Sequence, residues 1–421
     1  MTLNPLILLK SIIPHKAEHY FLLSAIMMGL TKSVFPNGTL GAYLSLGIAL
    51  LLFFYAILIS FKRNPLEGSA RPFYSFLVIW TILLTIQVLF TGTQGQGTNL
   101  STIFASDNMM PNLIPLTVMC YGRSIHYDIK YLFNVLILLS IIYIVLSPIF
   151  IPQILAFGSL VQEIGIESGG DEYGMMIGAS SLAILFFPGF LALFCKKYWN
   201  RKITILCYVV CLIQLFLMVF MARRGNSLMT ILSFLCLFFI YDNRNNKTIF
   251  PTILKIVAIV LVLFIVWTNY TGSLFGIMKE RMDVDSRTGL FDAFYNDMGV
   301  KDWIFGRGWF GQYYESSWLG EYRHGLECGY LHLILKGGLI YLIPYVLILL
   351  LSARNGLFHS SNYMCKAFGA ICLLRAINLI PFGVPSFTIQ EFVVWVGVLI
   401  CNKRCYLKMA DSDIFNILYV K

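Results

Sequence analysis

The chain has 421 residues, of which 58% are hydrophobic, 15% aromatic and only 12% charged. About a quarter of the residues of a soluble domain are charged, so this composition excludes a water-soluble globular protein. The mean hydropathy of +0.76 agrees. A net charge of +10 would favour nucleic acid as the partner of a soluble protein, but in a membrane protein basic cytoplasmic loops explain it. We therefore expect no nucleic-acid partner.

Apolar runs long enough to cross a bilayer follow one another along the chain. They predict an all-α polytopic membrane protein that forms a single membrane domain over residues 1–421. The fourth run contains Pro111 and Pro115, which predict a broken or re-entrant segment. About twelve spans are expected, at residues 19–35, 39–61, 73–91, 103–121, 131–152, 173–194, 203–222, 228–241, 251–270, 328–352, 364–380 and 387–402.

The ten cysteines indicate no covalent framework. Nine of them lie in or beside apolar runs, where a thiol behaves as a small hydrophobic group. Cys401 and Cys405 have the spacing of a metal-binding pair, but no second Cys or His pair lies nearby. We expect neither disulfides nor a metal. The first apolar run, from Tyr20 to Leu30, also lacks the small-residue cleavage pattern of a signal peptide.

The distribution of basic residues orients the spans. With the N-terminus in the cytoplasm, 20 of the 31 Lys and Arg residues fall on the inner face and 9 on the outer face, as the positive-inside rule requires. Both termini are then cytoplasmic. Arg223 and Arg224, in a short outer connection, oppose this rule. They bind a partner there, or one of them binds the carbonyls at a helix C-terminus.

One long hydrophilic segment, residues 271–327, forms a loop on the outer face between the ninth and tenth spans. Asp285 or Ser286 can cap a short helix that starts near Arg287 and carries one apolar face, which we expect on the membrane surface. The glycines of Phe305–Gly308 predict a turn whose amides can approach an anion. The loop is aromatic enough to be ordered. Its aromatic rings serve either sugars or the membrane interface, and they are Trp303, Phe305, Trp309, Phe310, Tyr313, Tyr314 and Trp318.

The exit of the loop passes directly into the tenth span. His324 and Glu327 are three residues apart, so they share one face if the helix already includes them. His332 and Lys336 follow one or two turns deeper. Arg375 lies in the eleventh span. Ionisable residues inside a span usually face a cavity or a partner, because burying them costs about 2.5 to 3.5 kcal/mol.

Four short motifs, in order, resemble the bacterial O-antigen polymerase and ligase superfamily. They are Met-Ala-Arg-Arg-Gly-Asn-Ser at 221–227, Asp-Ser-Arg-Thr-Gly-Leu at 285–290 with Trp-Ile-Phe-Gly-Arg-Gly at 303–308, and the closing segment 324–339. The likeness in span number and order covers nearly the whole chain, and the motifs cover about 60 residues. Glu327 stands where the ligase pattern has a His, which favours a polymerase.

The resemblance implies a GT-C-like fold in the bacterial inner membrane, with the active site on the periplasmic face. It implies a metal-independent and cofactor-independent glycosyltransferase. A glycan on undecaprenyl diphosphate would be transferred to the non-reducing end of an incoming lipid-linked repeat unit of O-antigen, capsule or exopolysaccharide. Its partners would be these lipid-linked oligosaccharides, membrane lipid and a chain-length regulator. The alternatives are an O-antigen ligase and a lipid-linked oligosaccharide flippase or other transporter.

The candidate site residues take three roles. Arg223, Arg224 and Arg287 would bind the diphosphate, since Arg is the bidentate ligand of phosphate. Glu327 or His324 would be the general base for the acceptor hydroxyl. A third set would bind glycan or support the loop: Arg307, Trp303, Trp309, Tyr330 and Arg375.

Overall fold

The computed structural model describes residues 13–33, 40–61, 64–91, 109–121, 128–145, 193–220, 224–242, 288–315, 321–380 and 383–419. These residues are mostly helical, as expected for an all-α membrane protein. The chain divides into two compact units. One comprises residues 1–5 and 136–285, and the other comprises residues 6–135 and 286–421.

The first unit contributes two long helices, α11 (Arg201–Phe220) and α12 (Arg224–Asp242), after the short turn η4 (Lys196–Tyr198). The side chain of Asn200 begins α11, because its Oδ1 accepts a hydrogen bond from the Ile203 amide at 2.9 Å. That bond satisfies one of the amides left free at a helix start.

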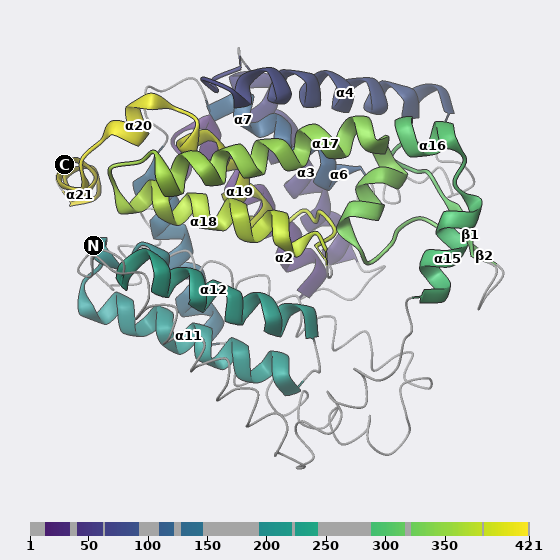
Figure 1. Ribbon diagram of the computed structural model, residues 1–421. Coiled ribbons are helices and arrows are strands. Elements are labelled where there is room, and N and C mark those ends of the chain that lie inside the picture. The colour runs from purple at the N-terminus through teal and green to yellow at the C-terminus, as the bar shows by residue number, and fades with distance from the viewer. Residues whose placement is uncertain are drawn as a thin grey trace. The chain divides into compact units, whose positions relative to one another are not determined.

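The second unit holds the other long helices. In chain order they are α2 (Ala17–Ser33), α3 (Leu40–Ser60), α4 (Ala70–Thr91), α17 (Gly329–Phe358), α18 (Tyr363–Asn378) and α19 (Ile389–Cys401). The short helices α20 (Arg404–Lys408) and α21 (Asp411–Tyr419) close the chain. Within this unit α17 lies between α4 and α18 (Figure 1). Rings from three elements meet in its core, where Phe53 contacts Phe21 and Phe392 edge to face.

Three described helices are long and apolar enough to cross a membrane, namely Tyr43–Ser60, Ala70–Val88 and Gly329–Phe358. Shorter apolar helices cover Met110–Cys120, Ile129–Val145 and Ile389–Cys401. Each falls on an expected span. The expected spans at 173–194 and 251–270 lie almost wholly outside the described residues. Helices α3 and α4 also expose large apolar side chains, which suits lipid rather than water.

The fourth expected span, where a break was predicted, changes its helix type instead. Helix α6 (Met110–Leu113), the 3-10 turn η1 (Ile114–Leu116) and α7 (Thr117–Cys120) follow one another with helical backbone angles at their junctions. Pro111 stands in the first turn, where its missing amide has no partner to lose. The hydroxyl of Tyr74 in α4 donates to the Pro115 carbonyl at 2.8 Å in the 3-10 turn.

A break divides α17. Gly338 has φ +71° and ψ −177° in the middle of this long apolar helix. A side chain there would collide with the loop, because an added Cβ would lie 2.0 Å from the Ile304 carbonyl oxygen. Only glycine combines that backbone conformation with so close an approach.

Candidate functional site

The described part of the predicted outer loop folds into two short helices and a hairpin. They are α15 (Thr288–Asp297), α16 (Val300–Phe305), β1 (Tyr313–Glu315) and β2 (Glu321–Arg323), with β1 antiparallel to β2. The helix expected after Arg287 is therefore α15, while its expected caps, Asp285 and Ser286, lie outside the described residues. The ring of Phe294 is fully buried and meets Trp303 and Tyr313 edge to face. The apolar face of α15 therefore packs inside the loop.

Arg307 ties the loop together. Its Nε and Nη2 donate to Oδ2 of Asp302, at 3.0 and 2.7 Å, and its Nη1 donates to Oδ2 of Asp297. Its Nη1 and Nη2 also reach the carbonyls of Gln312 and Asp297. All three guanidinium nitrogens are thus used by protein groups, and the geometry gives Arg307 the role of loop support.

The turn Phe305–Gly308 packs against the N-terminal part of α17. The Arg307 amide donates to the Leu335 carbonyl at 2.7 Å, and the Gly308 amide donates to the Lys336 carbonyl at 3.0 Å. The Gly306 amide bonds within α16. Positive φ angles at Gly306 and Gly308 permit this approach. The amides face helix carbonyls and not an anion, which corrects the anion-binding interpretation of this turn.

The break at Gly338 explains why these carbonyls are free. A helix carbonyl near a break loses its partner one turn later and needs another donor. Two carbonyls receive the turn amides, and a third, at Gly337, accepts the indole N–H of Trp80 from α4 at 3.0 Å. Loop, α4 and α17 are joined at one point, and Trp80 is a residue that the sequence analysis missed.

His324 and Glu327 lie before α17, not in it. The helix begins at Gly329 with Cys328 at its N-cap, so the two do not share a helix face. A shared helix face was expected only if the helix already included both residues. It does not include them, because β2 holds the chain extended up to Arg323. The Nε2 atoms of Gln312 and His324 are 2.8 Å apart. Glu327 is exposed.

The environment of His324 favours its neutral form. Burial lowers the pKa of its imidazole, the nearby ammonium of Lys336 lowers the pKa further, and the Phe310 carbonyl opposes the shift. Nδ1 of His324 is buried, and the imidazole lies next to the Phe310 carbonyl and the Gln312 side chain. A neutral imidazole is the form that a general base requires.

Two ionisable residues lie deeper in α17. Lys336 is fully buried, and its Nζ donates to the Gly311 carbonyl at 3.1 Å. His332 is buried, and neither of its ring nitrogens has a hydrogen-bond partner in the part of the chain that the structure describes. Its Nδ1 lies close to Gly325, where an added Cβ would be 3.1 Å away. Both side chains thus face the segments that flank the hairpin.

Arg375 forms an ion pair with a residue that the sequence analysis missed. Its Nε lies 3.0 Å from Oε2 of Glu391 in α19, and both side chains are buried. Oε1 of Glu391 accepts the Tyr345 hydroxyl at 2.7 Å, and Nη1 of Arg375 donates to the Gly383 carbonyl at 2.7 Å. The carboxylate at 391 within an expected apolar span was the available signal, since a buried charge needs a partner.

The three aromatic residues that were predicted to bind glycan or support the loop have different surroundings. Trp303 is half-buried and stacks on Tyr295, with centroids 5.7 Å apart. Trp309 is fully buried, and its indole N–H donates to the Thr85 hydroxyl in α4. The hydroxyl of Tyr330 donates to the Ala376 carbonyl. Trp303 can therefore offer a ring face to a sugar, whereas Trp309 and Tyr330 connect elements.

The predicted diphosphate ligands are described only in part. Arg223 and Arg287 lie outside the described residues, and Arg224 is the first residue of α12. All ten cysteines are free thiols. Within the described ranges, no group of His, Cys, Asp and Glu side chains gathers as metal ligands.

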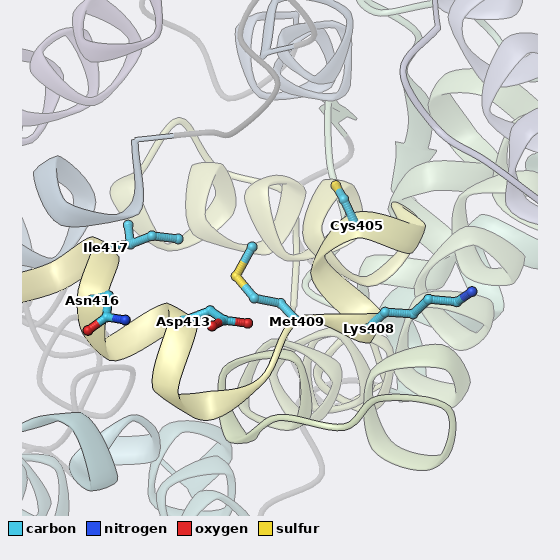
Figure 2. A pocket seen from close by; sticks show the side chains of 6 residues that line it. All are labelled: Cys405, Lys408, Met409, Asp413, Asn416 and Ile417. Atoms are coloured by element: carbon cyan, nitrogen blue, oxygen red, sulfur yellow. The ribbon is translucent and has the colours of Figure 1, made fainter.

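A pocket near the C-terminus involves none of the predicted residues. It lies between α20 and α21, and Figure 2 shows the side chains of Cys405, Lys408, Met409, Asp413, Asn416 and Ile417 around it. It is open to its surroundings, and its elements are separate from the predicted outer loop.

Comparisons with known protein families, curated proteins and solved structures find no match to this chain. The fold itself defines a helical protein whose apolar helices suit a membrane. In the described part of the site, the loop is hydrogen-bonded to a broken helix, and His324 and Glu327 lie in the segment that precedes this helix.

Proposed function

We propose that the protein is a polysaccharide polymerase of the bacterial inner membrane. In this proposal it has about twelve spans, cytoplasmic termini and residues 271–327 on the outer face. It transfers a glycan from undecaprenyl diphosphate to the non-reducing end of an incoming lipid-linked repeat unit. The observation that carries the proposal is the position of His324 and Glu327 in the segment between the hairpin and a long apolar helix, within motifs that resemble the polymerase family.

The chemistry needs a base and fixed cations. The base, His324 or Glu327, takes the proton of the acceptor hydroxyl, whose oxygen then attacks the anomeric carbon of the donor glycan. The bond to the diphosphate breaks as the new glycosidic bond forms, and undecaprenyl diphosphate leaves. Arg223, Arg224 and Arg287 neutralise the charge that develops on it. The lowered pKa of His324 supports it in the role of base.

The base can be tested by measuring polymer formation with purified protein and lipid-linked repeat units isolated from the cells that make the polysaccharide. We expect His324→Ala or Glu327→Gln to lower polymer formation by about 10²-fold or more, the range for loss of a general base. Lys301→Ala, at an exposed position of α16, is the matched control and should polymerise normally. Full activity in both base variants would sink the assignment.

The diphosphate ligands need a separate test. Arg287→Ala and Arg224→Ala should each shorten the polymer and lower its yield, because the leaving group loses a bidentate cation. Unchanged polymer at normal protein levels would remove them from the mechanism. Deletion of the gene should leave single repeat units on the surface lipid. Long polymer retained on the carrier would indicate a ligase, and loss of all outward glycan would indicate a flippase.

A further inference from the structure

We propose that α16 is a lipid-contacting element, so that the loop is anchored in the outer leaflet by the face carrying Val300, Ile304 and Phe305. These side chains are exposed by 77%, 39% and 49%. Three large apolar groups on a helix of six residues are unfavourable in water, at roughly 25 cal/mol for each Å² of apolar surface. The lipid contact does not depend on the proposed enzymatic activity, whereas the choice of the outer leaflet rests on the orientation given with the proposed function.

The exposed face of α16 is continuous with that of a helix long enough to span a membrane. The Phe305 ring lies against Trp80 of α4, with centroids 6.2 Å apart, and Trp80 stacks on Phe76 at 6.5 Å. Helix α4 satisfies the length and composition of a membrane span. Its exposed apolar side chains are Phe73, Phe76, Ile79, Ile82, Leu83, Ile86 and Phe90. If lipid covers these exposed side chains of α4, the same lipid also contacts α16.

The contacts place the turn after α16 along the second half of α4. Phe305 meets Trp80, Trp309 bonds to Thr85, and the backbone of Gly308 approaches the Gln87 side chain. Trp80 precedes the end of α4 at Thr91 by eleven residues, about 16 Å at 1.5 Å per residue. The turn therefore lies alongside α4, from Trp80 near the middle of the helix to Gln87 near its C-terminal end.

Non-helical backbone can enter a bilayer only when its polar groups are satisfied by protein. This turn meets that condition. The amides of Arg307 and Gly308 bond to α17, and the Arg307 guanidinium is neutralised by Asp297 and Asp302. The turn amides and the Arg307 guanidinium are thus satisfied by protein groups. The apolar side chains of α16 remain outside together with the exposed Lys301, whose long side chain can carry its ammonium to the lipid headgroups.

Helix α15 exposes one large apolar side chain, Tyr295. Its Phe294, and Met298 directly after the helix, are buried within the loop. Of the two described helices of the loop, the one that contacts the membrane is therefore α16, whereas the sequence had predicted the helix near Arg287 for this role.

Nitroxide labels in vesicles of phosphatidylcholine and phosphatidylglycerol test the proposal. In a Cys405→Ser parent, Val300→Cys and Ile304→Cys are compared with Lys301→Cys on the same helix and with Tyr322→Cys on the hairpin, all at exposed positions. We expect the ratio of oxygen to nickel-chelate accessibility to be severalfold higher at 300 and 304 than at 322, with 301 intermediate. Equal ratios at 300, 304 and 322, or labels shielded from both reagents, would overturn the proposal.

A second measurement uses the unmodified protein. A phospholipid with a photoreactive diazirine in its acyl chain should label peptides that contain residues 300–305, whereas peptides that contain residues 321–323 should stay unlabelled. Labelling of the hairpin but not of α16 would contradict the lipid contact, whatever the outcome of the nitroxide variants.

Discussion

Gly338 shows how one residue fixes the relation between the loop and the membrane helices. A residue with a side chain would need a backbone conformation reserved for glycine, and its Cβ would overlap the Ile304 carbonyl. The loop could then not reach the carbonyls of Leu335 and Lys336. The sequence contains this position as the second glycine of Lys-Gly-Gly-Leu, but the pattern alone does not distinguish a helix break from close helix packing.

We expect Gly338→Ala to destabilise the protein by at least about 3 kcal/mol, from backbone strain together with overpacking. The measurement is the yield of monodisperse protein in detergent and its melting temperature. Gly47→Ala is the control, because an added Cβ at Gly47 meets nothing within 4 Å. Equal melting temperatures for the two variants would show that the break is not required.

Glu18 is a buried carboxyl group with a distinct pH response. It precedes the first expected span, and its Oε1 accepts the Asp128 amide at 2.9 Å. Burial raises its pKa to about 7, against the opposing effect of that hydrogen bond. Between about pH 4.5 and 7 the folded protein therefore binds more protons here than the unfolded chain. Stability contributed by this group is present at low pH and falls as the pH rises through that window.

Glu18→Gln should flatten this pH dependence, because the amide has no charge to bury at any pH. We expect the variant to gain stability relative to the parent as the pH rises from 5 to 8, by at most about 3 kcal/mol. Melting temperatures across this range provide the measurement. Glu67→Gln, which changes a half-exposed carboxylate, is the control of equal charge change. Parallel curves for the parent and Glu18→Gln would refute the assignment.

At the scale of elements, the loop holds its shape through one guanidinium. Arg307 joins the end of α15, the middle of α16 and the residue before β1 by five hydrogen bonds. A lysine has a single nitrogen and cannot reproduce this planar arrangement. The sequence indicated an ordered loop from its aromatic content, but it could not assign partners to Arg307 among nine nearby carboxylates.

Arg307→Lys should loosen α15 and α16 by about 2 kcal/mol, the range for charge-assisted hydrogen bonds. Amide hydrogen exchange in residues 288–305 should then be roughly thirtyfold faster. Peptides from α18 should exchange at the parent rate. Lys301→Arg, a change of similar size at an exposed position of α16, should have no effect. Unchanged exchange in α15 would mean that aromatic packing alone holds the loop.

The helices were predictable because apolar runs of about 20 residues have few other structures open to them. The connections between them were not. From the sequence alone, Trp80 would be interpreted as an aromatic residue that faces lipid. Its hydrogen bond to the Gly337 carbonyl becomes evident only in the structure. The pair of Arg375 and Glu391 joins α18 to α19 across a separation of 16 residues. Such contacts depend on how helices rotate and pack, which hydrophobic periodicity does not specify in segments that are apolar on all sides.

At the scale of the whole molecule, the distribution of basic residues makes the most general prediction. The positive-inside rule places the C-terminal segment in the cytoplasm and the hairpin outside. Two exposed positions report on this, the native Cys405 and Tyr322→Cys. A membrane-impermeant maleimide on intact cells should label Tyr322→Cys and not Cys405, and inside-out vesicles should give the reverse. A Cys405→Ser parent measures the background from the remaining thiols. Labelling of both positions from the same side would mean that an even number of spans, and not the expected three, separates them. Labelling of Cys405 alone on intact cells would invert the orientation on which the outward active site depends.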